Sequence, residues 1–598
     1  MLGALLKYAH DYELVAEPGF APKVVRWNIL CQEDGRFLEV IDLATEGNRG
    51  LTFNRCPELS QPEMKRGGSG CRHFLVDSAD VVALLADGEP DSKLHAKHAY
   101  FTGLLRQAST VLPELAGIAE MLGDPAQLAV LQNRLRLGKA KPTDRVTFSL
   151  LNGDPSFPVD SDAWHDWWRQ FRRSLGEEKP SAKKSGPGEA GLARCLATGE
   201  LVEPVPTHPK IGGLTDVGGL SMGDVLSSYK QDAFCSYGLV QSANAAVSED
   251  AAAGYRAALN HLIQHNSRRL STTKIVFWYQ RSLDPKDDVL EMLLGPGHEE
   301  GVAEQGARKL LASIEAGERP DLRDNYFYAL TVSGASGRVM VHDWMEGRFD
   351  ELVRNVNRWF DDLEIVRPDG NGTAWTPRLY SLLVSLVREL NEKSRDEIAA
   401  IETGLWRAAL RCNVPVPGAA MAKALARIRV DVLDPKRPLS AARMGLLRAF
   451  LIRKQGGDRS MEPYLNENHP APAYHCGRLM AMLAALQHRA LGDVGAGVVQ
   501  RYYASASSTP ALVLGRLMRT AQFHLDKLDR GLARWHEGRI ADTWGRIRDR
   551  IPTTLDLEGQ SVFALGYYQQ IATDRARTRQ SSTDGDAPEI ASDDQETA

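Results

Sequence analysis

Hydrophobic and polar residues follow different periods in different parts of the chain. Near the start, two short runs of apolar, β-favouring residues at 24–30 and 37–41 flank a Glu-Asp-Gly turn at 33–35, which predicts a hairpin. Residues 92–137 then show the spacing of helices. We therefore expect a mixed α/β part over residues 1–175.

A second mixed part is expected at residues 192–400. A stretch at 176–191 that is rich in Lys, Pro, Gly, Ser and Glu precedes it and is typical of a linker or an exposed loop. Apolar runs at 275–279, 326–332 and 338–342 predict buried strands.

The last part of the chain is helical in period. Leu479, Leu483 and Leu486 are one example of apolar residues that recur three or four positions apart, and we predict a helical bundle over residues 401–580. Residues 581–598 are polar and acidic, which favours a disordered tail. The expected class is α+β, with mixed α/β N-terminal and middle portions and an α-helical bundle as the C-terminal domain.

Composition narrows the protein class. The chain has 598 residues, of which 43% are hydrophobic and 25% charged, as in ordinary globular proteins. No apolar run approaches the roughly 20 residues that a membrane span needs, and the first residues lack the order of a signal peptide, so we expect a cytoplasmic protein. The seven cysteines form no C-x-x-C pair, which argues against a disulfide framework and a zinc site.

The net charge of −5 conceals a basic region. Residues 408–454 contain ten basic and two acidic side chains, a local charge of +8. Such a region is consistent with contacts to phosphate, because neutralising a phosphate releases counterions. An ordinary solvated helix face is the alternative interpretation.

The sequence offers no complete catalytic arrangement. It contains no G-x-x-x-x-G-K-[ST], H-E-x-x-H or G-x-S-x-G motif. His342 and Asp343 are a superficial match to metal-dependent phosphohydrolases, which need further metal ligands. His475 and Cys476 could suggest a base and a nucleophile, but neighbours in sequence on a helix point in different directions. We expect no catalytic centre, metal or cofactor, and a metal-dependent nuclease that uses His342 and Asp343 stays as an alternative.

Residues 195–278 form the most unusual segment. Its glycine-rich stretch I-G-G-L-T-D-V-G-G at 211–219 lets backbone come close to a partner, and free N–H groups in such loops can face phosphate oxygens. Gln241 and Asn244 follow beside aromatic and basic residues, and amide side chains can read base edges. The alternative is a glycine-rich surface loop followed by a core helix.

Ordered motifs run through this segment and beyond it. They are C-L-x-T-G-E at 195–200, H-P-K-I-x-G at 208–213, A-F-x-S-Y-G-x-x-Q-x-A-N-A at 233–245, A-L-N at 258–260, T-x-x-x-F-W at 273–278, R-G-G-S-G at 66–70, G-R-V at 337–339, A-Y-H-C-G-R-L at 473–479 and L-G-Y-Y-Q-Q at 565–570. In their order along the chain these motifs resemble those of the large subunit of the subtype I-C CRISPR interference complex, Cascade of the Dvulg subtype. Two stretches depart from that family: Ser228-Tyr229-Lys230 stands where S-F-N is usual, and nothing in the family matches the residues after Arg579.

The resemblance implies a subunit without enzymatic activity. It would recognise a short protospacer-adjacent motif in duplex DNA, promote R-loop formation and present the displaced non-target strand to a recruited helicase-nuclease. Its partners would be a crRNA-containing complex with backbone and crRNA-processing subunits. Because exchanging DNA–DNA for RNA–DNA pairing is nearly balanced, modest protein contacts can decide whether the loop forms. A purely structural bridging subunit is the remaining alternative.

Residue roles follow from combining the motifs with this resemblance. We predict three sets of DNA contacts: motif-proximal residues, further polar readers beside them, and a basic region for the single-strand backbone. They are Lys65, Arg66, Ser69, Lys210, Gly212 and Gly213; Lys230, Gln231, Gln241 and Asn244; and Arg427, Arg429, Arg437, Arg443 and Arg448. Tyr237, Phe277 and Trp278 are expected to be packing residues.

The family also implies that the C-terminal helical part can be made separately as a small subunit, by translation from an internal start in the same coding sequence. Met461, Met480 and Met482 are the candidate starts, and the product would be about a fifth of the chain.

Overall fold

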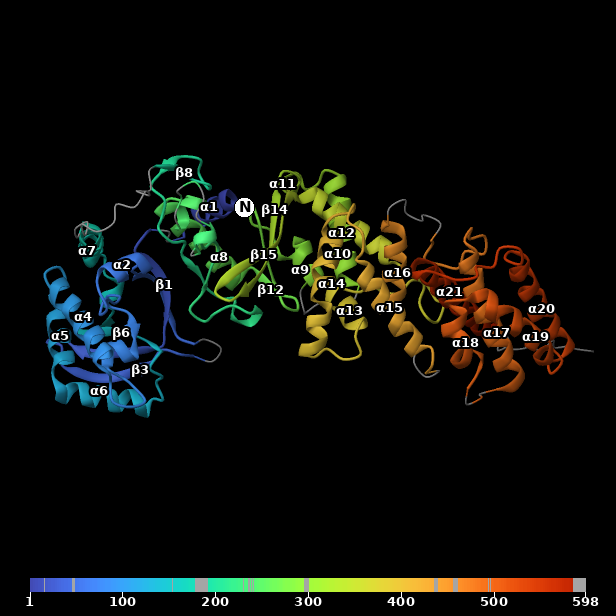
Figure 1. Cartoon of the computed structure of the whole chain (residues 1–598), viewed down its shortest axis with the longest axis horizontal. Helices are drawn as coiled ribbons and strands as arrows, with labels where there is room; N and C mark the ends of the chain where they lie inside the picture. Colours follow the sequence, from blue (N-terminus) through green and yellow to red (C-terminus); the bar gives the residue numbers. More distant parts are fainter. Residues whose placement is uncertain are drawn as a thin grey trace, which may run out of the picture. The chain divides into compact units, whose positions relative to one another are not determined.

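The computed structural model describes residues 1–14, 17–45, 49–152, 154–177, 192–229, 231–234, 237, 239, 241–294, 301–434, 439–454, 461–492, 494 and 496–584 (Figure 1). It divides into two compact units. Unit 1 consists of Met1–Asn266 and Ser333–Met340, and unit 2 of Ser267–Val332 and the chain from Val341 onward. The expected α+β class is confirmed. The three-part division stays a prediction, and residues 192–266 group with the N-terminal residues.

Unit 1 contains short sheets and eight of the described helices. Its strands are β1 (Phe20–Val25), β2 (Trp27–Gln32), β3 (Phe37–Asp42), β4 (Leu51–Pro57), β5 (Asp77–Ser78), β6 (Arg145–Asn152), β7 (Asp154–Ser156), β8 (Ala193–Arg194), β9 (Leu201–Val202), β10 (Lys210–Ile211) and β11 (Asp224–Val225). Its helices are α1 (Leu2–Asp11), α2 (Gln61–Arg66), α3 (Ala79–Ala83), α4 (Ser92–Ala108), α5 (Leu115–Gly123), α6 (Pro125–Leu137), α7 (His165–Glu177) and α8 (Glu249–His265).

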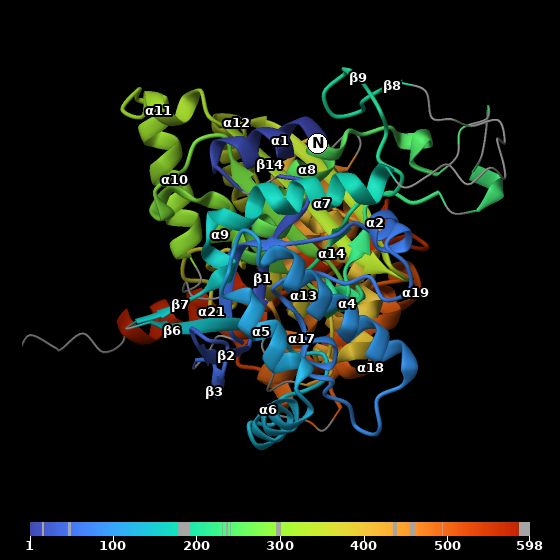
Figure 2. The same ribbon diagram turned by 90° about the vertical axis from the view of Figure 1, so that its left-hand side faces the viewer.

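The main sheet of unit 1 has the strand order β3-β2-β6-β5, with β7 paired to β6. Strands β2 and β3 form the expected antiparallel hairpin, in which Trp27 pairs with Asp42, and β2 runs parallel to β6. Buried aromatic residues such as Phe101, Phe148 and Trp164 fill the core next to this sheet. Away from it, α1 lies beside α8, where the Tyr8 hydroxyl is 3.0 Å from Nδ1 of His261 (Figure 2).

Unit 2 begins with a sheet and continues as helices. It contains the strands β12 (Ser267–Arg269) and β13 (Lys274–Tyr279) and the larger parts of β14 (Tyr326–Ala335) and β15 (Arg338–Arg348), whose residues 333–340 belong to unit 1. Its helices are α9 (Val289–Leu294), α10 (Val302–Glu315), α11 (Pro320–Arg323), α12 (Phe349–Leu363), α13 (Leu379–Ser385), α14 (Glu392–Leu410), α15 (Gly418–Asp431), α16 (Ala441–Arg453), α17 (Pro472–Leu491), α18 (Val498–Ala506), α19 (Pro510–Leu525), α20 (Arg530–Gly545) and α21 (Leu557–Asp584).

The strands expected from the apolar runs are present in unit 2. Strand β13 pairs antiparallel with β14, so that Trp278 lies opposite Tyr328. Phe277 and Trp278 are buried, which confirms that they are packing residues. No helix among the described residues is long and apolar enough to cross a membrane.

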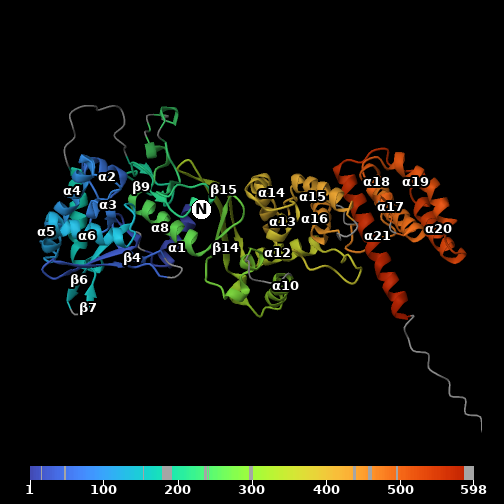
Figure 3. The same cartoon turned by 90° about the horizontal axis from the view of Figure 1, so that it is seen from below.

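Helices α17 and α21 pack closely against each other in the helical C-terminal part (Figure 3). Helix α21 continues to Asp584, so the first residues of the expected disordered tail, 581–584, are helical instead. The rest of that tail, 585–598, lies outside the described residues.

Candidate nucleic-acid interface

Lys65 and Arg66 lie in the last turn of α2, and both are exposed. The R-G-G-S-G motif at 66–70 therefore begins on a helix, which a capping box starts at Ser60. The Ser60 N–H donates to Glu63 Oε2 at 2.6 Å, and the Glu63 N–H donates to Ser60 Oγ at 3.4 Å. Ser69 follows in an exposed turn. The helix dipole favours two cations at a helix C-terminus, and their exposure makes them accessible to an anion.

An arginine outside the predicted set fixes α2. Nε of Arg172, on α7, lies 2.8 Å from Glu63 Oε1, and its Nη2 lies 2.7 Å from Glu249 Oε1 at the start of α8. Arg172 therefore connects α2 to α8 through two carboxylates. It belongs to an amphipathic helix with several arginines, and nothing in the sequence distinguished it from its neighbours.

Buried polar groups hold the chain on both sides of α2. Before the helix, the Lys23 ammonium donates to the Pro57 carbonyl at 2.7 Å. After it, Nδ1 of His73 accepts the Leu59 N–H at 3.1 Å, and the His73 N–H donates to Asp77 Oδ2 at 3.1 Å. Burial moves the pKa of His73 well below its usual value, so the ring is neutral and can act as this acceptor. The backbone around the basic turn is thus firmly positioned.

The H-P-K-I-x-G motif lies against α8. His208 is buried, and burial lowers its pKa, so the ring is neutral. Its Nε2 is 3.0 Å from the Ala245 carbonyl, which can only accept, and its Nδ1 is therefore the acceptor of the Tyr255 hydroxyl at 2.8 Å. This histidine connects the motif both to α8 and to the residues just before it.

The two glycines of this motif face the protein itself. The Gly212 N–H donates to Asn260 Oδ1 on α8 at 2.9 Å. Gly213 has a φ of +82°, and a Cβ there would lie 2.7 Å from a methyl group of Ile263. The predicted role of these glycines, a close approach to phosphate, is therefore wrong for the Gly212 N–H, which is already bonded. Lys210, on β10, is half-buried and stays a candidate.

The amide-bearing segment forms a short 3-10 helix, Gln241–Ala245. Gln241 is exposed with a φ of +50°, whereas the Asn244 amide donates to the Gln241 carbonyl at 3.0 Å and shapes the local turn. Gln231 is exposed, and Lys230 lies outside the described residues. Tyr237 is fully exposed, so its expected packing role is wrong.

Helix α8 thus carries three of the segments that the sequence singled out. Residues 58–66 are held by the ion pair of Glu58 with Arg256 of α8 and by Arg172, which joins α2 to Glu249. Residues 208–213 bind Tyr255 and Asn260 of α8. Residues 241–245 are connected to α8 through His208, which contacts the Ala245 carbonyl. The sequence predicted DNA contacts in each of these segments but did not indicate that the segments lie close together. The structure brings them together around one helix.

A family model described as CRISPR-associated protein (Cas_Csd1) matches residues 5–573. The chain belongs to this family. Membership makes it a subunit of a CRISPR-associated Cascade complex. No curated protein matches the chain.

The basic region of this Cas_Csd1 family member does not form the predicted free face. Arg443 is buried, where Nε donates to the Ser385 carbonyl at 2.6 Å and Nη1 pairs with Asp431. Arg448 is buried as well, and it donates to the Met461 carbonyl at 2.9 Å and to the Asp361 carbonyl at 2.6 Å. Both guanidinium groups therefore connect parts of the protein, and the predicted phosphate contact is wrong for them.

Two further arginines of the region are also engaged. Arg427 pairs with Asp431 at 3.1 Å, and Arg429 donates to Ser508 Oγ at 2.9 Å and to Gln560 Oε1 at 2.8 Å. Arg437 lies outside the described residues. Arg427, Arg443 and Arg448 thus bind an aspartate and carbonyl groups of the protein, which neither interpretation of the sequence anticipated.

His342 and Asp343, the residues of the alternative nuclease site, bind an arginine of the protein. Asp343 Oδ2 accepts from Nε of Arg407 at 2.7 Å, and the same guanidinium donates to the His342 carbonyl at 2.6 Å. Among the described residues, no group of three or more His, Cys, Asp or Glu side chains is placed to hold a metal ion.

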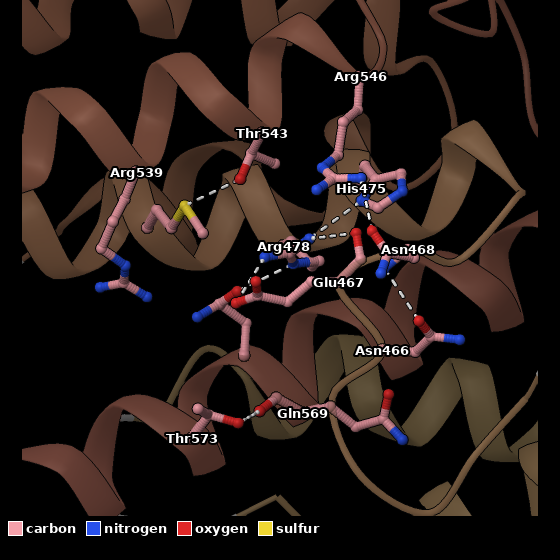
Figure 4. Close-up of polar contacts among 12 residues, drawn as sticks. Asn466, Glu467, Asn468, His475, Arg478, Arg539, Thr543, Arg546, Gln569 and Thr573 are labelled. Atoms are coloured by element: carbon pink, nitrogen blue, oxygen red, sulfur yellow. Dashed lines mark hydrogen bonds and ion pairs between the residues drawn. The ribbon is translucent and has the colours of Figure 1, made fainter.

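The two C-terminal motifs meet each other (Figure 4). Arg478 of α17 donates from Nε to Gln570 Oε1 of α21 at 3.0 Å and from Nη1 to the Glu467 carbonyl at 3.3 Å. His475 contacts the His469 carbonyl through Nε2 at 2.7 Å, and burial lowers its pKa to about 4. Burial raises the pKa of Cys476 to about 12. Through its contact with His469, His475 holds the loop before α17 to the helix.

Proposed function

We propose that the chain is the large subunit of a type I-C CRISPR RNA-guided surveillance complex. It recognises the protospacer-adjacent motif in duplex DNA, promotes R-loop formation and presents the displaced strand to the recruited helicase-nuclease, without catalysis of its own. The family match over residues 5–573 supports the complex. The gathering of three polar segments around α8 is the observation that supports DNA recognition by unit 1.

The exposed residues divide by chemistry. Lys65 and Arg66 end α2 with exposed cations, which suit phosphate oxygens and position a duplex without reading its sequence. Gln241 and Gln231 are exposed amides, and amides can donate to and accept from base edges. The Gly212 N–H is bonded to Asn260, so this glycine holds the H-P-K-I-x-G motif against α8.

Replacing Lys65 and Arg66 together with alanine tests the assignment. We expect the assembled complex to bind a matched duplex roughly tenfold more weakly, with a salt slope lower by about two units, because two phosphate contacts are lost. Gel-shift titrations at several salt concentrations, with matched and motif-mutated duplexes, measure both quantities.

Arg134 and Arg136 provide the matched control. They are also exposed cations in the last turn of a helix, α6, so Arg134→Ala with Arg136→Ala removes the same charge from the same unit. The control should leave binding unchanged. Equal binding by the two double variants would overturn the assignment of α2, and unaltered motif discrimination after removal of all proposed contacts would favour a structural bridge.

The small subunit is part of the same proposal, and the fold favours one internal start. Met480 and Met482 lie inside α17, so starting there would remove its first half, including Gly477 and Arg478. Met461 precedes the whole of α17 and the residues that Arg478 holds. A product from Met461 would contain residues 461–598.

Intact-mass analysis of protein made from the native coding sequence tests this start. We expect a second species that begins at residue 461 and that disappears in Met461→Leu, a substitution that conserves volume at a buried position. Met480→Leu, also at a buried position, is the control and should keep the short species. A single full-length species from the native sequence would refute internal translation.

A further inference from the structure

One face of α19 is exposed, basic and apolar at once. Leu512, Arg516, Arg519 and Phe523 follow one another at spacings of four, three and four, so they share one side of the helix. Leu512 and Phe523 are 77% and 69% exposed. Helix α19 contains no acidic residue, and neither guanidinium has a bonding partner among the residues that the structure describes. We call these four residues the α19 face.

Several other arginines of the helical part bind groups of the protein, in contrast to Arg516 and Arg519. Arg443 and Arg448 are buried against carbonyls, and Arg539 of α20 pairs with Asp574 of α21. Two free guanidinium groups flanked by two large apolar side chains fit a partner that is acidic and carries a few apolar residues.

The chain itself contains such a segment. Residues 585–598, Gly-Asp-Ala-Pro-Glu-Ile-Ala-Ser-Asp-Asp-Gln-Glu-Thr-Ala, have five acidic side chains and no basic one. A short apolar group, Ala587, Pro588, Ile590 and Ala591, lies between the acidic residues. This order of acidic and apolar residues complements the α19 face. The segment also lies beyond residues 5–573, which the family model matches.

The segment starts within reach of the face. Arg539 contacts Asp574, so α20 lies beside α21 at a point about 15 Å along the helix from Asp584. Helix α20 in turn packs on α19. The fourteen residues of the segment span up to about 50 Å when extended. This length exceeds the sum of the roughly 15 Å along α21 and the diameters of two helices. Being part of the same chain also gives the segment a high effective concentration.

We propose that residues 585–598 bind the α19 face of their own chain and keep it from other polyanions. The acidic side chains pair with Arg516 and Arg519, and the apolar group covers Leu512 and Phe523. This inference is independent of the proposed recognition of DNA by unit 1.

Fluorescence anisotropy with a labelled peptide of residues 585–598 tests the proposal. A chain that ends at Asp584 should bind the peptide, and binding should weaken at least tenfold in the same chain with Arg516→Gln and Arg519→Gln. The complete chain should bind the peptide more weakly than the shortened one, because its own segment occupies the face. A matched double variant in unit 1, Arg134→Gln with Arg136→Gln, should bind like the shortened chain, and circular dichroism should show that all variants are folded.

Single-stranded oligonucleotide is the competing occupant. If the proposal holds, an unlabelled dT20 binds the shortened chain more tightly than the complete one, and the gain is lost with Arg516→Gln and Arg519→Gln. Peptide binding that ignores both arginines would overturn the proposal. So would oligonucleotide binding that depends on Arg516 and Arg519 but is the same with and without residues 585–598, which would assign the face to nucleic acid.

Discussion

Replacing Gly477 with alanine is expected to lower the free energy of unfolding of unit 2 by about 3 kcal/mol. A Cβ on Gly477 of α17 would lie 2.0 Å from the Phe563 carbonyl oxygen of α21 and 2.9 Å from the Tyr567 nitrogen. A Cβ on Gly566 of α21 would likewise lie 2.1 Å from the Tyr474 carbonyl oxygen. Each helix therefore presents a glycine to the backbone of the other, and one added methyl group forces the buried pair apart.

Gly515 provides the control for this prediction. It also lies within a helix, α19, but a Cβ there would meet no atom within 4 Å. Gly515→Ala should raise stability by about 0.5–1 kcal/mol, because alanine restricts the unfolded chain and favours a helix. Urea unfolding followed by circular dichroism measures both variants. Effects of the same sign would contradict the close helix contact.

These glycines explain why part of the fold could be predicted from the sequence and part could not. The motifs at 473–479 and 565–570 stood out by their residue types, and helical period placed both on helices. That they pack on each other depends on a contact between residues about ninety positions apart, which no local pattern encodes. The strands at 275–279 and 326–332 were found because an uninterrupted apolar run is itself a local signal.

The same distinction holds for the candidate interface. Lys65, Arg66 and Gln241 were predicted from residue type, and the structure leaves them exposed. Arg443 and Arg448 have the same chemistry in the sequence, but helix-end carbonyls and an aspartate from elsewhere in the fold bind them. Charge counts along the chain cannot distinguish an arginine that a distant carbonyl satisfies from one that is free. The α19 face was not predicted, because two arginines do not stand out in a charge count along the chain.

A second large effect is expected at Glu402, on α14. This side chain is completely buried, and neither carboxylate oxygen has a well-formed hydrogen bond among the described residues. Burial raises the pKa of Glu402 to about 8, and Ser271, Arg269 and Arg395 only partly oppose this shift. The folded chain therefore holds this carboxyl protonated at neutral pH, although it ionises near 4.5 in an unfolded chain.

The direction of the pH effect follows from that difference. Between pH 4.5 and 8 the folded state binds one more proton at this site than the unfolded state, so this contribution to stability is complete below pH 4.5 and is lost as pH rises towards 8. The loss is about 1.4 kcal/mol per pH unit and sums to roughly 5 kcal/mol between pH 4.5 and 8. Above pH 8 both states are ionised, and the contribution no longer changes.

Glu402→Gln replaces the carboxyl with an amide that stays neutral, so it should separate this site from all others. The variant's free energy of unfolding minus that of the parent should rise steadily from pH 5 to 8 and then level off, as measured by urea denaturation at each pH. Glu397 is exposed on the same helix and pairs with Lys423 at 2.9 Å, which lowers its pKa. Glu397→Gln should therefore shift stability by the same amount at every pH above 5. If the stability difference between Glu402→Gln and the parent does not change with pH either, water reaches the Glu402 carboxyl in the folded chain. Only a carboxyl that is shielded from water keeps its proton up to pH 8.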